Sequence, residues 1–230
     1  MPNNIASTIG NSAKTLADEV YQKIRDDIVH GHLTAGDKLK IEPLKKRYSV
    51  GASPLREALN RLSSDGFVFS KGQQGFNVSE MSLADLEDVT NVRILIENDA
   101  LTQSILHGDD HWESNVVAAF HSLSKIENSE NKSEPFLLEQ RNYTFHNSLL
   151  SACNSKRINQ FYKTLYDQHK RYRNLARGAK IEGRNLHEEH KALYHAALNR
   201  DIKLATEANE FHIRKTAEVV MLIKKEEWQN

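Results

Sequence analysis

Apolar residues recur at helical spacing through most of the chain, beginning near its amino end. From residue 16 to residue 30 they stand four positions apart, with charged residues between them. These positions are Leu16, Val20, Ile24 and Ile28. The spacing predicts an amphipathic helix that ends before Gly31. Residues 1–14 show no such pattern and include several Asn and Ser residues, so we expect a flexible tail there.

Two shorter amphipathic stretches follow, separated by a break that contains glycine. The first covers residues 41–48, and the second begins at Ser53-Pro54. We expect Ser53 to cap the free backbone N–H groups, with Pro54 at the first helical position, where a missing donor has no effect. The buried stripe is then Leu55, Ala58, Leu59 and Leu62, and the outward positions are Arg56, Asn60 and Arg61. Two short helices joined in this way can place side chains in a DNA major groove.

A hairpin is predicted directly after these helices. Phe67-Val68-Phe69 and Phe76-Asn77-Val78 are short β-rich runs on either side of a tip that contains glycine. Gly66 is placed to close the preceding helix in a left-handed conformation. Residues 15–80 are therefore expected to form a winged helix-turn-helix domain of three helices and a β-hairpin wing.

Beyond Val78 the pattern predicts helices only. Their expected ranges are 83–105, 112–126, 135–152, 158–176, 187–198 and 202 to about 225. A run of helices without strands favours an all-α antiparallel helical bundle over residues 81–230. The predicted fold class is mainly α, with the winged helix-turn-helix first and the bundle second.

Charge separates the two predicted domains. The chain is neutral, with 31 Lys and Arg against 31 Asp and Glu. From Lys38 to Lys71 there are eight basic and three acidic residues, so this segment carries +5 and the remainder −5. Phosphate binding by one domain produces such a pattern, which argues against a non-specific architectural DNA binder. The simpler alternative, that Lys45-Lys46-Arg47 is only a solvated helix face, does not explain the adjoining turn and wing.

Cysteine use and hydropathy indicate the compartment. The single cysteine, Cys153, excludes an intrachain disulfide framework and suits a reducing environment. No apolar run is long enough to span a bilayer, and the first ten residues lack the features of a secretory signal. The sequence predicts a cytoplasmic protein with no membrane partner.

The first domain resembles a known family. The resemblance rests on Gly31-His32-Leu33, Gly36-Asp37, Pro54-Leu55-Arg56-Glu57-Ala58-Leu59 and Gly66-Phe67-Val68, and it is to GntR-family transcriptional regulators. Ala52 stands where the family often has an arginine for base contact, so the docking mode is implied but the operator sequence is not. The resemblance and the helix-turn-helix pattern together give the expected DNA-contacting residues: Lys45, Ser53, Pro54, Arg56, Asn60, Lys71 and Gln73.

The helical part is similar to the FCD-type effector domain of the FadR subfamily. The matching residues are Arg93-(x)₃-Glu97, Phe145-His146, Glu189-His190 and Glu210-(x)-His212. In many FCD domains one Asp and three His bind a divalent metal, which implies ligation by His146, His190 and His212. Asn142, one helical turn before His146, replaces the Asp and is a weak fourth ligand. Three neutral imidazoles with an open position suit zinc or nickel-like ions.

The histidines have two other interpretations. The chain has 11 of them, and surface positions are expected for several, including His111, His169 and His195. In the absence of a metal, the three matching histidines could instead bind an anionic effector by hydrogen bonds.

A small carboxylate is the expected effector. The candidates for binding its carboxylate are Arg93, Arg141 and Tyr143, with Arg173 as a further arginine. The arginines are candidates because a guanidinium group binds a carboxylate bidentately. The alternative is structural. Arg93 and Glu97 would form a surface ion pair along one helix, and Arg141 and Arg173 would form exposed salt bridges.

These observations predict a ligand-responsive transcriptional regulator rather than an enzyme. In this family such a protein is most often a repressor, binding a palindromic DNA operator as a homodimer and released by its effector. The alternative from another class is a metal-dependent enzyme using the three-histidine site. It would need a general base near a metal-bound water, and Glu189 points away from the adjacent His190 on the helix.

Overall fold

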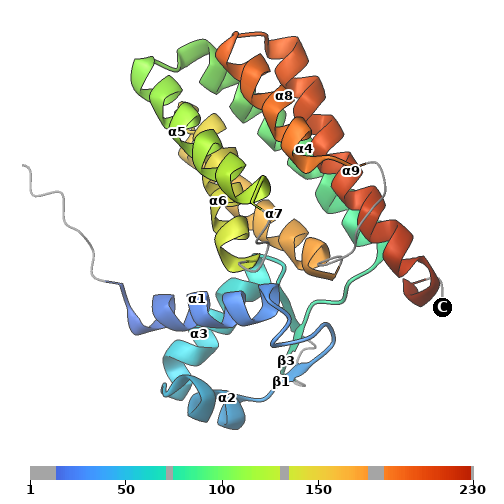
Figure 1. The fold of residues 1–230 in the computed structure, drawn as a ribbon. Helices are drawn as coiled ribbons and strands as arrows, with labels where there is room; N and C mark the ends of the chain where they lie inside the picture. Colours follow the sequence, from blue (N-terminus) through green and yellow to red (C-terminus); the bar gives the residue numbers. More distant parts are fainter. Residues whose placement is uncertain (1–13, 71–74, 130–134, 176–183, 229–230) are drawn as a thin grey trace, which may run out of the picture. The chain divides into compact units, whose positions relative to one another are not determined.

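The computed structural model describes residues 14–70, 75–129, 135–175 and 184–228 (Figure 1). The chain divides into two compact units, Met1–Glu80 and Met81–Asn230. We call them the winged unit and the helical unit. The expected tail lies outside the described residues, apart from its last position.

Three helices form the body of the winged unit: α1 (Leu16–Val29), α2 (Ile41–Tyr48) and α3 (Ala52–Ser64). A capping box begins α1, because the Thr15 hydroxyl accepts a hydrogen bond from the Asp18 backbone N–H at 3.1 Å and the Asp18 carboxylate accepts one from the Thr15 N–H at 2.9 Å. The apolar faces of the helices meet in one core, which includes Ile24, Ile28, Leu55, Leu59, Leu62 and Phe67. The predicted stripe on α3 is therefore the buried one.

The start of α3 differs from the prediction. Gly51 is the N-cap and makes no side-chain cap, so Ser53 and Pro54 are the second and third helical residues. Pro54 is tolerated there because the N–H groups of the first turn have no partner within the helix. The left-handed residue of the turn between α2 and α3 is Ser49, with φ 53°, rather than the glycine.

The end of α3 follows the prediction. Gly66 has φ +75°, the Phe67 N–H donates to the Leu62 carbonyl at 2.9 Å, and the Gly66 N–H donates to Ser63 at 3.2 Å. This pair of bonds is a Schellman motif, which turns the chain from α3 into the sheet.

The wing belongs to a three-stranded antiparallel sheet. Its strands are β1 (Lys38–Leu39), β2 (Val68–Ser70) and β3 (Phe76–Val78), in the order β1-β3-β2. Val68 pairs with Val78 across the hairpin, and Lys38 pairs with Asn77 on the other side of β3. The hairpin was predicted, but β1 was not, because two residues are too few to show an alternating pattern.

The helical unit is a bundle of α4 (Leu83–His107), α5 (Asp110–Glu127), α6 (Pro135–Leu149), α7 (Lys156–Leu175), α8 (Leu186–Leu198) and α9 (Ile202–Trp228). The long helices α4 and α9 lie side by side, α7 packs against both, and α5 packs against α6 and α8 (Figure 1). The described residues of this unit contain no strand. The predicted fold class is confirmed.

Polar side chains cap the first turns of several of these helices, α4 and α5 among them. Ser82 caps α4 by accepting a hydrogen bond from the Asp85 N–H at 3.1 Å, and Asp109 caps α5 by accepting one from the Trp112 N–H at 2.9 Å. The start of α4 is also tied to α7. The Tyr172 hydroxyl donates to the Asp85 carboxylate, and the Ser82 N–H donates to the Tyr172 oxygen at 3.3 Å.

Candidate DNA-binding surface and histidine cluster

The outer face of α3 carries the residues predicted to read DNA. Ser53, Arg56 and Asn60 are exposed and Pro54 is half-buried, opposite the apolar stripe that packs in the core. Arg56 has no hydrogen bond or ion pair within the described residues, so its guanidinium group is free to bind a phosphate or a base edge. This is the surface that a helix-turn-helix presents to a major groove.

Arg61, on the same helix, is already paired. An Arg61 nitrogen lies 2.5 Å from an Asp18 oxygen, and the guanidinium carbon lies 4.7 Å from the centre of the Tyr21 ring. Hydrogen bonding from Arg61 lowers the pKa of Asp18 from 3.8 to about 2. Arg61 therefore fastens α3 to α1, a contact that its predicted outward direction did not reveal.

The remaining predicted contacts lie on α2 and the wing. Lys45 is partly exposed, and its amino group lies 3.0 Å from the Glu42 carboxylate, a pair that solvent weakens. Lys71 and Gln73, the two wing residues, lie outside the described residues.

Three buried histidines converge inside the helical unit. His146 comes from α6, His190 from α8 and His212 from α9. Their ring centres lie 4.7 to 5.2 Å apart, and one nitrogen of each lies within 4.8 Å of the others. Helices from three parts of the sequence thus bring together the three residues that the FCD resemblance indicated.

Carboxylates orient two of these rings. His190 Nδ1 lies 2.7 Å from Glu127 Oε1, and His212 Nδ1 lies 2.8 Å from Glu189 Oε2. Because a carboxylate only accepts hydrogen bonds, Nδ1 of each ring is the donor, and Nε2 is the nitrogen left for a ligand. His190 Nε2 is buried and has no hydrogen-bond partner in the described parts of the chain. Carboxylates commonly orient metal-bound histidines in this way.

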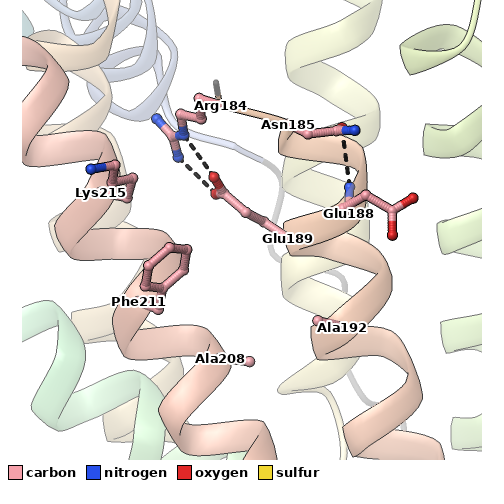
Figure 2. A pocket seen from close by; sticks show the side chains of 8 residues that line it. All are labelled: Arg184, Asn185, Glu188, Glu189, Ala192, Ala208, Phe211 and Lys215. Atoms are coloured by element: carbon pink, nitrogen blue, oxygen red, sulfur yellow. Dashed lines mark hydrogen bonds and ion pairs between the residues drawn. The ribbon is translucent and has the colours of Figure 1, made fainter. Parts of the chain in front are cut away.

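Glu189 also forms part of the wall of an outer pocket. Figure 2 shows this pocket between α8 and α9, with Phe211 and Lys215 on one side and Glu188 and Ala192 on the other. Arg184 holds both oxygens of Glu189 at 2.8 Å. Glu189 therefore contacts His212 on α9 and orients its ring. Sequence spacing gave no sign of this role for Glu189 or Glu127, because both contacts join different helices.

Protonation and donor set fit a divalent metal. Burial, followed by the neighbouring histidines, holds the pKa of His146 and of His212 well below the usual histidine value. Neutral imidazoles are the form that binds zinc and similar ions, and an unpartnered Nε2 inside the cluster suits a ligand. Asn142 lies on the same face of α6, but its amide nitrogen donates to the Tyr166 hydroxyl at 2.9 Å, so part of its bonding capacity is used.

The residues predicted to bind the effector differ in burial and in ion pairing. Arg93 and Glu97 are buried, 3% and 1% exposed, and paired at 2.6 Å, so the expected surface ion pair is wrong. Arg173 is largely buried and pairs with Glu139 at 2.8 Å. Arg141 is exposed on α6, away from the buried face that holds His146. Tyr143 is half-buried against the ring of Tyr166.

Of the three histidines predicted to lie at the surface, two are exposed and one is buried. His111 and His195 are exposed. His169, on α7, is fully buried, so its predicted surface position is wrong. Nothing in the sequence indicated that α7 packs against α4 and α9.

The winged unit is a helix-turn-helix whose second helix, α3, carries Arg56, unpaired within the described residues, and a helical bundle follows it. This combination defines a DNA-binding transcriptional regulator. Residues 16–78 match the bacterial regulatory proteins of the gntR family, and residues 88–215 match the FCD domain. The chain belongs to the GntR family, in the group whose second domain is of the FCD type.

Relatives with this organisation are regulators. The chain is 41% identical over 212 residues to the uncharacterized HTH-type transcriptional regulator BphR of Paraburkholderia xenovorans, covering 91% of this chain and 86% of that protein. It is 33% identical to the HTH-type transcriptional repressor GlaR of Escherichia coli, covering 84% and 90%. The E. coli McbR/YncC structure shares the fold, with a TM-score of 0.75, 16% identity and coverage of 90% and 98%.

These relatives decide between the two function classes. Both domains and the named relatives are those of transcriptional regulators, not enzymes. Among the described helices, none is both long and apolar enough to cross a membrane.

Proposed function

We propose that the protein is a repressor that binds a palindromic operator as a homodimer and leaves it when a small carboxylate binds in the helical unit. The observation that carries this proposal is the convergence of three buried histidines near Arg93, in a regulator of the GntR family. The relative GlaR is named a repressor, which supports the sign of the response.

Operator binding follows from the outer face of α3. Ser53, Pro54, Arg56 and Asn60 enter the major groove, Lys45 binds phosphate from α2, and Lys71 and Gln73 contact DNA from the wing. A two-fold dimer places two such helices about one DNA turn apart, so the operator has matching half-sites.

The helical unit holds the metal and the effector. His146, His190 and His212 would ligate a zinc or nickel-like ion, with Asn142 as a weak fourth ligand, and the bound ion supplies an electrophilic centre for a carboxylate oxygen. Arg93 adds a buried cation: after burial and the neighbouring histidines, it is among the charges that hold the pKa of His146 and of His212 low. Arg141 is exposed, so it contributes only if the effector reaches the surface of α6; Tyr143 contributes an aromatic wall.

The effector can lower the affinity for DNA only to the extent that it prefers the DNA-free conformation. An effector weakens operator binding only by the ratio of its affinities for the free and DNA-bound conformations. A carboxylate that bound both conformations equally would occupy the site without derepression.

Mobility-shift titration with the DNA flanking the gene, with and without small carboxylic acids, tests the proposal. Arg56→Ala should weaken operator binding by about tenfold or more, because a good base contact contributes about 1–3 kcal/mol. Arg214→Ala on α9, which removes an exposed arginine paired with Glu210, is the matched control and should bind as the wild type does. Unchanged affinity of Arg56→Ala would overturn the assignment of α3. Absence of any acid that releases the DNA would overturn the effector response.

A further inference from the structure

The outer pocket between α8 and α9 has room for a small molecule. Its volume is about 350 Å³, within the usual range for pockets that bind small ligands. Its lining comes from α8 and the two residues before it (Arg184, Asn185, Glu188, Glu189 and Ala192) and from α9 (Ala208, Phe211 and Lys215) (Figure 2). The three clustered histidines are not among these residues, so the pocket is a separate feature of the helical unit.

The pocket has an apolar end and a cationic end. Ala192, Ala208 and the Phe211 ring supply the apolar surface, and Phe211 is 57% exposed although it is a large apolar side chain. Arg184 and Lys215 lie towards the other end of the pocket in Figure 2. An occupant with an apolar body would remove the Phe211 ring from water, which favours its binding.

The guanidinium group of Arg184 is held in place but not fully used. Its side chain is 10% exposed, and its Nε and Nη2 each donate to one Glu189 oxygen at 2.8 Å. Nη2 also donates to the Thr216 hydroxyl at 2.9 Å, whereas Nη1 has no hydrogen-bond partner in the described parts of the chain. Because the guanidinium plane is fixed by these contacts, Nη1 is a preorganised cationic donor at the wall of the pocket.

The carboxylates of the lining are engaged elsewhere. Both oxygens of Glu189 accept hydrogen bonds from Arg184, and Oε2 also accepts one from His212 Nδ1 at 2.8 Å. Glu188 is exposed and lies 3.5 Å from the Lys191 amino group, and Lys191 does not line the pocket. Neither carboxylate is therefore placed to bind a cation in the pocket.

Lys215 supplies a second cation. Its amino group lies 2.9 Å from the Glu218 carboxylate, but both side chains are exposed, so solvent weakens the pair. The pocket thus offers an occupant charged donors and an apolar wall. The complement of that surface is a negative charge on an apolar body.

We propose that the outer pocket binds a small organic acid with one negative charge and an apolar body. The acid group accepts hydrogen bonds from Arg184 Nη1 and the Lys215 amino group, and the apolar body lies against Phe211, Ala192 and Ala208. A single charge fits best, because the nearby Glu188 and Glu189 repel a second one. The site uses neither the metal nor the histidines, so the inference goes beyond the proposed function and does not depend on it.

Calorimetric titration of the full-length protein with matched probes tests the proposal. 3-Phenylpropionate carries both the charge and the apolar body, 3-phenylpropionamide has the body without the charge, and acetate has the charge without the body. We expect 3-phenylpropionate to bind about tenfold or more tightly than either of the others, because charge-assisted hydrogen bonds and apolar burial both contribute. Its affinity should be the same for the protein as purified and after metal is removed with a chelator.

Two variants change the pocket without replacing Arg184 or any residue of the histidine cluster. Lys215→Gln should weaken binding of 3-phenylpropionate about two- to fivefold and leave that of the amide unchanged, because only the acid uses the charge. Phe211→Ala should weaken binding of the acid about tenfold. Lys203→Gln and Leu204→Ala are the matched controls, since these exposed residues lie on α9 but do not line the pocket.

The outcomes separate this inference from the proposed function. The inference fails if 3-phenylpropionate does not bind, if the amide binds as tightly as the acid, or if both variants bind the acid as the wild type does. Loss of binding after chelation would place the acid at the histidine cluster, which overturns the inference and leaves the proposed function standing. A lower oligomeric state of Phe211→Ala in sedimentation would also overturn it, because the pocket would then be a contact between copies of the chain. Retained binding in the outer pocket with no acid able to release operator DNA would overturn the proposed function alone.

Discussion

One ion pair in each unit shows how differently an arginine and a carboxylate can be placed. In the winged unit, Arg61 pairs with Asp18 while the two side chains remain 44% and 36% exposed. In the helical unit, Arg93 pairs with Glu97 while both side chains are at most 4% exposed. The exposed pair joins α1 to α3, and Arg56, on the same helix as Arg61, has no partner in the described part of the chain and can bind DNA. The buried pair instead belongs to a polar interior, whose remaining groups only water or a ligand of matching chemistry can satisfy.

The largest expected effect comes from breaking the buried pair. Glu97→Ala leaves the Arg93 charge without its partner, which should lower the free energy of unfolding by about 3–5 kcal/mol. Glu210→Ala, which breaks the exposed pair with Arg214, should change it by no more than about 1 kcal/mol. Urea denaturation followed by tryptophan fluorescence measures both, because Trp112 and Trp228 belong to the helical unit. Equal effects of the two changes would show that burial does not make the Arg93–Glu97 pair more stabilising than an exposed pair.

An intermediate effect is expected from the carboxylates that orient the histidines. Glu127→Gln and Glu189→Gln remove the charge behind His190 and His212, and each should weaken zinc binding about 10- to 100-fold. The matched control is Glu188→Gln, since Glu188 is exposed and pairs only weakly with Lys191. Competition with a chromogenic chelator gives the affinities. Unaltered zinc affinity in both variants would mean that these carboxylates do not support a metal.

The smallest effect concerns the exposed pair that joins α3 to α1. The pKa of Asp18 is about 2 in the folded protein against 3.8 for the free group, so its stabilising contribution is complete above pH 3.8 and is lost as the pH falls towards 2. The difference in thermal midpoint between the wild type and Asp18→Asn should therefore shrink from pH 5 to pH 2. Circular dichroism melts measure it, with Glu19→Gln as the control. A difference that stayed constant over this range would show that the ion pair does not stabilise the fold.

Much of the fold could be predicted from the sequence because each helix has a regular apolar face. The bounds of α2 were predicted to the residue, and the predicted starts of α1, α4 and α9 agree with the structure. Errors arose where the signal is short or local. α3 starts at Ala52, two residues before the predicted first helical residue Pro54, because its N-cap is Gly51, which makes no side-chain cap, and not Ser53. β1 has too few residues to show a pattern.

The site was only partly predictable because helical phase shows a face and not what covers it. The positions of His146, His190 and His212 followed from family motifs, and the structure brings them together. The burial of Arg93 and His169 depends on how α4, α7 and α9 pack, which no local pattern contains. The contacts of Glu127 and Glu189 join residues 63 and 23 positions apart, beyond any spacing argument. All the DNA contacts, those of Lys71 and Gln73 included, stay predictions.

The hydrogen bonds that Tyr172 makes with Ser82 and Asp85 have a mechanical consequence. Tyr172 lies three residues after His169 on the same helix, and its hydroxyl holds the first turn of α4. Ser82 is the second residue of the helical unit, so the peptide leading out of the winged unit is anchored to α7 almost as soon as it arrives. A rotation or translation of α7 would therefore strain or break the hydrogen bonds that hold the first turn of α4.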